Sequence, residues 1–349
     1  MKISEKLLNM SPYDPTENKY SVKLDANESF IELPPVIKAK MLSAIAEVAE
    51  NRYPDPSCRV LREAASKIYN VPDKNIVCGN GSDELLSIII SSFNMKGDKI
   101  MTAAPDFSMY EFYAHNAECE VVTYEKDDAL VIDPNELISM AKEQNVNMLI
   151  FSNPCNPTGV GLPASDIKRI VSSLDSLVVV DEAYMEFWNE SILDSVLEYD
   201  NCILLRTCSK AFGMAALRVG FAIANDILIS CMNKSRSPFN VSALVQAGAA
   251  SVLSEREYLE ECCEKIRKNT EELRHMALEL TEKNQNFEYM PTVTNFVLLK
   301  TKKAKEYYNE LLGRDICVRL VKGKYLRITS GSADENRIVM DALAQISER

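Results

Sequence analysis

One lysine, Lys210, lies among small and apolar residues in the stretch RTCSKAFGMAALRVG, residues 206–220. A lysine whose ammonium is poorly hydrated loses its proton more easily than a surface lysine, and the neutral amine is a nucleophile. Most single lysines are surface residues, but the neighbours at 211–215 favour a poorly solvated site here. The stretch therefore predicts a nucleophilic lysine, provided that the rest of the chain supplies a group on which it can act.

Two further motifs follow expected strands and carry donors for an anionic ligand. GNGSDE (79–84) passes through two glycines into a helix start, where free N–H groups at Ser82 and Asp83 favour an anion. Ser82 as a plain N-cap is the alternative. In NPCNPTG (153–159), two prolines and a glycine fix a turn that leaves the amide of Asn156 free to donate. A purely structural turn is the alternative for this motif.

A fourth motif, VVVDEAY (178–184), ends a buried strand with the carboxylate of Asp181. Burying a carboxylate is costly unless a cation meets it, so the partner is either a nearby arginine or a cationic ring nitrogen. Tyr184 follows three residues later and would reach the same ligand. Near Lys210, the side chains of Thr207, Ser209 and Arg218 are expected to face a phosphate.

These features together match pyridoxal 5'-phosphate. The lysine would form a Schiff base with the aldehyde, and Asn156 and Tyr184 would hold the ring hydroxyl. Asp181 would keep the pyridine nitrogen protonated, so that the ring can take up the electrons of a carbanion.

The hydrophobic pattern predicts an α/β fold with a mostly parallel sheet. Apolar runs of four to six residues alternate with amphipathic stretches, which is typical of strands buried on both faces. A long helix with apolar positions from Leu259 to Leu280 is expected to span two domains, with a coiled coil as the alternative. We expect an N-terminal arm (1–35), a large cofactor-binding domain (36–255) and a small α+β domain (256–349). The expected strands are 75–79, 99–103, 119–124, 147–154, 176–184, 201–207 and 218–224, then 294–300, 315–321 and 324–330.

The amino-acid composition limits the classes of molecule that the protein is expected to bind. The net charge of -12, from 51 acidic and 39 basic residues, argues against nucleic acid or an anionic membrane. No apolar run approaches ~20 residues, so no membrane span is expected, and the first residues lack an apolar signal core. The ten cysteines form no CxxC pair and the two histidines have no metal-ligand spacing, so we expect no metal site. Reduced cysteines are typical of a cytoplasmic protein.

The chain resembles the fold-type I pyridoxal-phosphate aminotransferases, and among them the histidinol-phosphate aminotransferase family. The motifs NPxNPTG, DEAY and SKxxGxxxLRxG indicate the superfamily. RYPDP, DEAYxEF and the final arginine pair indicate the family. The segments that carry the resemblance stand in the family's order between about residues 12 and 331: LDANES, RYPDP, GNGSDE, NPCNPTG, VVVDEAYMEF, RTCSKAFGMAALRVG, NFVLL and YLRITSG.

The resemblance implies a role for each matching residue. Lys210 would hold the cofactor aldehyde and shuttle the proton, Asp181 would pair with the ring nitrogen, and Phe107 would stack on the ring. Asn156 and Tyr184 would bind the ring hydroxyl. The cofactor phosphate would be held by Ser82, Asp83, Ser209, Arg218 and, from a neighbouring subunit, Tyr53, whereas substrate would meet Tyr13, Asn27, Arg319 (phosphate) and Arg327 (carboxylate). Tyr53 and Tyr13 imply a homodimer with shared active sites.

The expected reaction is a reversible transamination of histidine biosynthesis, between glutamate or 2-oxoglutarate and imidazole-acetol phosphate or histidinol phosphate. The partners would thus be a small-molecule amino donor and a 2-oxo acid. An aromatic amino acid aminotransferase and a phosphothreonine-type decarboxylase are alternatives, which differ in the Cα bond held perpendicular to the ring. A non-catalytic regulatory module would need a DNA-binding domain, for which the first 35 residues are too short.

Overall fold

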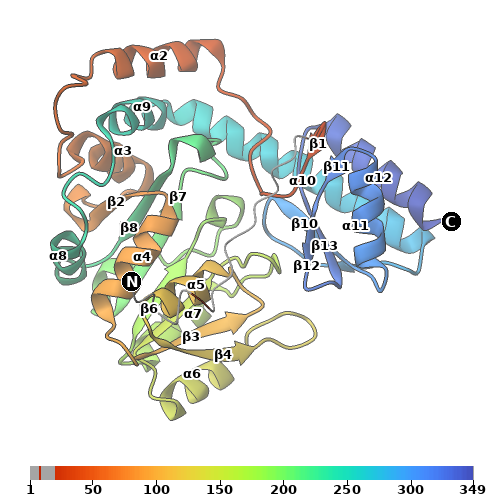
Figure 1. Ribbon diagram of the computed structural model, residues 1–349, viewed down its shortest axis with the longest axis horizontal. Coiled ribbons are helices and arrows are strands. Elements are labelled where there is room, and N and C mark those ends of the chain that lie inside the picture. Colours follow the sequence, from red (N-terminus) through yellow and green to blue (C-terminus); the bar gives the residue numbers. More distant parts are fainter. Residues whose placement is uncertain (1–7, 9–19, 349) are drawn as a thin grey trace.

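A seven-stranded sheet forms the larger part of the molecule, at the left of Figure 1, in a computed structural model that describes residues 8 and 20–348. The strand order is β2-β8-β7-β6-β5-β3-β4. Strands β3 to β7 run parallel to one another, whereas β8 is antiparallel to both β2 and β7. The prediction of a mostly parallel sheet is confirmed. The strands are β2 (Ile76–Asn80), β3 (Lys99–Ala104), β4 (Glu120–Glu125), β5 (Met148–Ser152), β6 (Leu177–Asp181), β7 (Cys202–Thr207) and β8 (Val219–Ile223).

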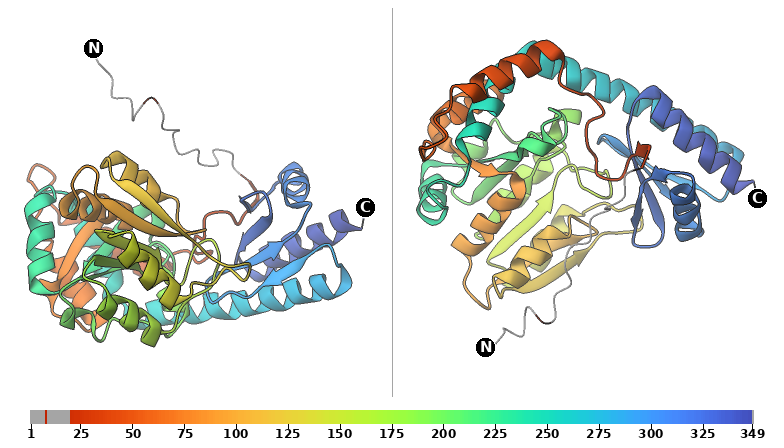
Figure 2. Two further views of the ribbon diagram at one scale, coloured as in Figure 1. Left: turned by 90° about the horizontal axis from the view of Figure 1, so that it is seen from below. Right: turned by 45° about the horizontal axis from the view of Figure 1, so that its top comes forward.

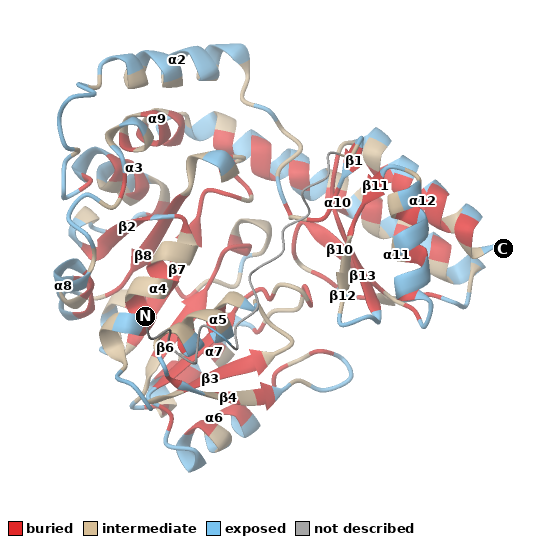
Figure 3. Ribbon diagram, viewed as in Figure 1, coloured by how far each residue is buried: buried red, intermediate tan, exposed pale blue. Residues whose placement is uncertain are grey.

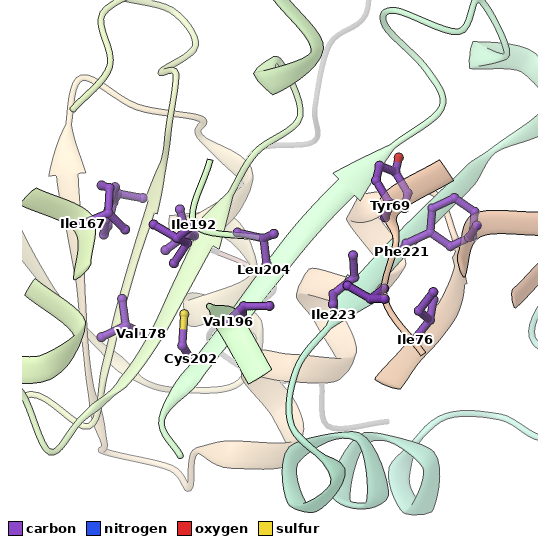
Figure 4. Packing of buried hydrophobic residues seen from close by; sticks show 14 of the residues in the cluster. Tyr69, Ile76, Ile167, Val178, Ile192, Val196, Cys202, Leu204, Phe221 and Ile223 are labelled. Atoms are coloured by element: carbon purple, nitrogen blue, oxygen red, sulfur yellow. The ribbon is translucent and has the colours of Figure 1, made fainter. Parts of the chain in front are cut away.

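Both faces of this sheet are apolar and covered by helices. Val178 and Val180 of β6 pack into one hydrophobic cluster, and Val179 between them packs into a second. This explains the continuous apolar runs, because every side chain of such a strand is buried. The first face is covered by α3 (Arg59–Tyr69), α6 (Pro134–Glu143), α7 (Ala164–Ser173) and α9 (Ala243–Leu253), and the second by α4 (Ser82–Phe93), α5 (Met109–Asn116) and α8 (Asp226–Ser235). Figure 4 shows part of the first cluster, with Ile167 of α7 near Val178.

A four-stranded antiparallel sheet, β12-β13-β10-β9, forms the smaller part at the right of Figure 1. Its strands are β9 (Glu288–Met290), β10 (Phe296–Lys300), β12 (Arg319–Val321) and β13 (Tyr325–Thr329), with helices α11 (Ala304–Gly313) and α12 (Ala333–Ser347) packed on them. The short strand β1 (Val22–Lys23) pairs in parallel with β11 (Ile316–Cys317). The segment that precedes the LDANES motif is therefore tied to this smaller part.

Helix α10 (Arg256–Lys283) runs along both parts, as Figure 2 shows. Leu259 and Cys263 pack in the cluster of the larger part, and Leu273, Ala277 and Leu280 pack in the cluster of the smaller one. The expected long helix is present, and its apolar stripe faces both cores of its own chain. The stripe is thus used for packing within the chain, which removes the reason to invoke a coiled coil.

Helix α2 (Pro35–Ala46) has no buried residue and lies against α9 at the top of Figure 3. Short 3₁₀ turns lie at Asp73–Asn75, Met185–Phe187, Val196–Glu198 and Ala215–Leu217. Within the part of the chain that the structure describes, no helix has both the length and the apolar character needed to cross a bilayer.

Candidate active site

The strands of the larger sheet deliver the motif residues to one edge. The parallel strands β3, β5, β6 and β7 end at Ala104, Ser152, Asp181 and Thr207, and the residues that follow line one cavity of about 660 Å³. Strand β2 ends at the same edge, because it is antiparallel to β8, which starts there beside Thr207. This is the edge at which open α/β sheets bind ligands.

The cavity gathers nearly all of the residues expected to act in the site. Tyr53 does not line it; its side chain is 82% exposed and stacks on Phe239, with the ring centroids 4.5 Å apart. Because its expected contact is with a second subunit, that role stays a prediction. Tyr13 lies outside the described residues. The expected residues that do line the cavity are Asn27, Ser82, Asp83, Phe107, Asn156, Asp181, Tyr184, Ser209, Lys210, Arg218, Arg319 and Arg327.

The amine of Lys210 has few polar neighbours. Its Nζ donates a hydrogen bond to the carbonyl oxygen of Ala26 over 2.8 Å. Loss of solvent, and then the positive charge of Arg327, lower the pKa of Lys210 to about 8. The fully apolar neighbours Ala211 and Phe212 belong to the core beneath it. A lysine in this state supplies the neutral amine near neutral pH.

The carboxylate of Asp181 is 4% exposed and is held by neutral donors. Its Oδ2 accepts a hydrogen bond from the Tyr110 hydroxyl over 2.9 Å, and its Oδ1 accepts one from the Ala183 amide over 3.1 Å. Burial raises the pKa of Asp181 to about 7. Among the described residues, no lysine or arginine forms an ion pair with it. The salt-bridge alternative is therefore wrong for Asp181, which suits a cationic ligand instead.

The arginine near this motif, Arg206, pairs with the carboxylate of the next residue, Glu182. Glu182 lies 2.6 Å from Nη2 of Arg206, whose Nη1 lies 2.9 Å from Glu186. The Glu182 side chain is 1% exposed, and it also accepts a hydrogen bond from Ser191. The two adjacent carboxylates of the DEAY motif thus differ in environment. Glu182 is paired inside the protein, and Asp181 faces the cavity.

Replacing Glu182 by alanine is expected to lower the free energy of unfolding by about 3–5 kcal/mol, because Arg206 would keep a buried charge without its nearest partner. Urea unfolding measures this loss. Glu279→Ala is the matched control, since it breaks an exposed pair with Lys283 and should cost less than about 1 kcal/mol. Equal losses in the two variants would contradict the assignment of Glu182 to the core.

An anion cradle lies where β2 turns into α4. Gly81 occupies the N-cap position, so Ser82 is the first helical residue and the plain N-cap alternative is wrong. A Cβ on Gly81 would lie 2.4 Å from Nη2 of Arg218, and one on Gly220 would lie 2.6 Å from the Ser82 amide. The two glycines therefore let the helix N-terminus and the guanidinium approach each other closely.

Hydroxyl groups complete this cradle. The hydroxyl of Thr207 donates to Oγ of Ser209 over 3.0 Å, and Arg218 reaches the same Ser209 oxygen at 3.5 Å. Arg218 also pairs with the Asp83 carboxylate at 2.9 Å. This pairing neutralises Asp83, so that its backbone N–H and the helix dipole still favour an anion.

Amide and phenol groups also line the cavity. The amide of Asn27 donates to the hydroxyl of Tyr184 over 2.8 Å. Oδ1 of Asn156 accepts a hydrogen bond from Arg327, which leaves its Nδ2 as the donor end. Arg327 is buried and also donates to the carbonyl oxygen of Asp25.

Two arginines occupy opposed positions in the smaller sheet. Arg319 of β12 is directly opposite Arg327 of β13, and both line the cavity. Like charges in opposed positions of a sheet repel each other. A bound anion would relieve this repulsion, so the pair marks the part of the cavity suited to a carboxylate or a phosphate.

A buried hydrogen-bond network around Asp106 was not predicted from the sequence. This carboxylate accepts hydrogen bonds from the amide of Phe107 over 2.8 Å and from both the amide and the hydroxyl of Ser152. Lys126, with a side chain that is 1% exposed, lies 3.8 Å from Asp106 and 3.1 Å from Sγ of Cys155. The network joins the loops that carry Phe107 and Asn156. Asp106 was detectable as a carboxylate at a strand end, whereas Lys126 stands between charged neighbours that predict a surface residue.

The family model for aminotransferase class I and II matches residues 19–343. The chain therefore belongs to the class I and II aminotransferases, enzymes that use pyridoxal phosphate. This agrees with the resemblance drawn from the motifs.

Three individual proteins are similar to this chain in sequence or in fold. The chain is 41% identical to a histidinol-phosphate aminotransferase of Clostridium kluyveri over 96% of this chain and 95% of that protein. Its fold matches a Sinorhizobium meliloti histidinol-phosphate aminotransferase in complex with pyridoxal-5'-phosphate, with a TM-score of 0.90, 23% identity and coverage of 99% and 98%. An L-threonine-O-3-phosphate decarboxylase of Porphyromonas gingivalis also matches, with a TM-score of 0.80, 24% identity and coverage of 94% and 100%. The structural matches establish the fold alone.

Proposed function

We propose that this enzyme catalyses the reversible transfer of an amino group between L-histidinol phosphate and 2-oxoglutarate, yielding imidazole-acetol phosphate and glutamate. The observation that carries the proposal is the opposed pair Arg319 and Arg327 in the cavity that holds Lys210. One partner of the reaction carries a phosphate and the other two carboxylates, and guanidinium groups bind both kinds of anion. The curated relative from Clostridium kluyveri supports the same reaction.

The residues of the cavity fit pyridoxal phosphate. The cradle of Ser82, Asp83, Ser209 and Arg218 would hold its phosphate, since Gly81 and Gly220 let the Arg218 guanidinium and the start of α4 approach each other without an intervening Cβ. When bound, the cofactor supplies an aldehyde that takes up the amino group and a ring that accepts electrons from the substrate Cα.

The remaining residues would orient the reacting groups. Asp181 would pair with the ring nitrogen, Asn156 and Tyr184 would bind the ring hydroxyl, and Phe107 would lie against the ring. Lys210 would bind the aldehyde and later move the proton at the substrate Cα, for which its lowered pKa makes it suitable.

The substrate groups would meet the smaller part of the protein. Arg327 would take the carboxylate of glutamate, and Arg319 would take the phosphate of histidinol phosphate. Asn27 and Tyr13 would contact the substrate as well. Buried Arg327 is already held by Asn156 and the Asp25 carbonyl, so its position is fixed before an anion binds.

Replacing Arg319 by glutamine is expected to lower kcat/KM for L-histidinol phosphate about 10- to 100-fold, the range for loss of a charged hydrogen bond. The value for glutamate should fall less than that, because Arg327 would still bind one of its carboxylates. Steady-state kinetics with each donor measure both numbers, with Arg337→Gln on α12 as an exposed control. Equal losses for the two donors would contradict a phosphate-specific role for Arg319.

We also propose that the protein acts as a cytoplasmic homodimer with shared active sites. Helix α2 exposes Val36 and Leu42, and the stacked Tyr53 and Phe239 are exposed as well, which is typical of a surface that another chain covers. None of the ten cysteines is paired in a disulfide, in keeping with a reducing compartment. The arm (1–35), the large domain (36–255) and the small domain (256–349) are proposed as its units.

A further inference from the structure

We propose that Tyr110 is a positioning residue for the reaction: its hydroxyl keeps Asp181 ionised and correctly oriented to pair with a protonated ring nitrogen. This inference rests on the proposed function, because it assumes that a cationic ring nitrogen meets Asp181. It adds a residue that none of the sequence motifs singled out.

Tyr110 touches two functional side chains at once. It is the second residue of α5, is fully buried, and lines the cavity. Its hydroxyl lies 2.9 Å from Oδ2 of Asp181. Its ring meets the ring of Phe107 edge to face, with centroids 5.6 Å apart and planes at 84°. One rigid side chain therefore links the carboxylate for the ring nitrogen to the aromatic residue for the ring face.

The phenol is a donor that does not change its protonation state under working conditions. Burial and the nearby charges of Asp181 and Asp106 hold the pKa of Tyr110 well above its usual value. The hydroxyl proton of Tyr110 therefore points to the Asp181 carboxylate over the whole pH range in which the enzyme works. The Ala183 amide fixes the second oxygen in the same way. The Asp181 carboxylate thus keeps one orientation, and its remaining lone pairs can accept from a further donor.

The direction of the electrostatic effect follows from the neighbours of Asp181. Burial raises the pKa of Asp181, and the carboxylates of Asp106 and Asp83 act in the same direction. The Tyr110 hydroxyl and the Ala183 amide oppose them by stabilising the ionised form. Removing the hydroxyl would make the carboxylate more basic. A proton shared with the ring nitrogen would then move towards Asp181, and the ring would lose its cationic character.

The test is Tyr110→Phe, which removes the hydroxyl and keeps the ring. Tyr307→Phe is the matched control, because Tyr307 is fully buried in the smaller part and its hydroxyl has no hydrogen-bond partner among the described residues. Both variants are loaded with pyridoxal phosphate labelled with ¹⁵N in the ring, and the ¹⁵N resonance is recorded without substrate. We expect the protonated position in the control and in the unaltered enzyme, and a shift towards neutral pyridine in Tyr110→Phe.

Kinetics provide a second readout. In Tyr110→Phe, kcat should fall about 10- to 100-fold for glutamate and L-histidinol phosphate alike, with KM nearly unchanged, because a hydrogen bond to a charged group acts through the cofactor and not through one donor. A ¹⁵N resonance that stays at the protonated position overturns the proposal, whatever the rates do. Because that resonance is recorded without substrate, rejection of histidinol phosphate as a substrate would leave the test of Tyr110 intact.

Discussion

Replacing Lys210 by alanine is expected to abolish transamination and leave the protein folded. The change removes the amine that would bind the aldehyde and the group that would move the proton at Cα. Proton transfer by a positioned side chain alone contributes about 10²–10⁴-fold, so the combined loss in kcat should reach at least about 10⁴-fold. The fold should persist, because the substitution removes one hydrogen bond, to the Ala26 carbonyl. It also removes a positive charge that lies near Arg327.

Two measurements separate the chemical role of Lys210 from a structural one. Single-turnover rates with glutamate give the loss in activity, and the visible absorption band of the lysine-bound cofactor should be missing from Lys210→Ala. Lys210→Arg serves as the control that keeps a positive charge but cannot bind the aldehyde, and it should be equally inactive. Turnover above one hundredth of the normal rate in Lys210→Ala, an order-of-magnitude threshold, would contradict the assignment.

The lowered pKa of Lys210 adds a dependence on pH. A lysine of pKa about 8 is neutral in roughly a quarter of molecules at pH 7.5, compared with roughly a thousandth for the usual value of 10.5. Uptake of the cofactor by the empty protein needs the neutral amine, so its rate should rise with pH and level off above about pH 8. A rate that keeps rising towards pH 10 would show an ordinary, hydrated lysine.

Replacing Asp181 by asparagine is expected to lower kcat by roughly 10²–10³-fold, because a buried cation would lose its charged partner. Asparagine keeps the shape and one oxygen that can accept from Tyr110 or Ala183. The loss should appear with every amino donor, since it acts on the ring nitrogen. Single-turnover rates with glutamate and L-histidinol phosphate measure it, and Asp181→Glu serves as the variant that keeps the charge.

In the cofactor-free protein, Asp181→Asn should not lower the free energy of unfolding, although it lowers kcat. Burial raises the folded-state pKa of Asp181 to about 7, above its unfolded value of 3.8. The ionised carboxylate therefore destabilises the folded protein increasingly as pH rises from about 4 to 7, and this cost remains at pH 8. Asp181→Asn should then resist urea at least as well as the unaltered protein at pH 8. A variant with activity within tenfold of normal, or one that fails to fold, would contradict this account.

The sheet and most of the cavity could be predicted because they follow from local patterns. Apolar runs such as that of β6 gave the strands, and the polar residues at their ends then had to meet at one edge. Strand β8 was predicted at 218–224, but its antiparallel direction was not, since an apolar run carries no sign of its direction. Arginine pairing was assigned to Asp181 as an alternative, but Arg206 pairs with Glu182, because successive side chains of a strand point to opposite faces.

Contacts between distant segments were the least predictable part of the site. The carbonyl of Ala26 accepts from Lys210, and any residue type would offer that carbonyl. Tyr110 reaches Asp181 from α5, whose eight residues are too few to show a clear helical period. Lys126 is buried only because Asp106, Cys155 and the Pro105 carbonyl surround it, and none of these adjoins it in sequence.

The reaction proposed for this enzyme is tested most directly by one spectrum. Purified protein loaded with pyridoxal phosphate is mixed with L-histidinol phosphate in the absence of any 2-oxo acid, and the visible band is followed. We expect the band of the lysine-bound cofactor to give way to that of the amine form within seconds, and 2-oxoglutarate to restore it. A band that histidinol phosphate leaves unchanged, but that phenylalanine, tyrosine or phosphothreonine alters, would contradict the proposed substrate.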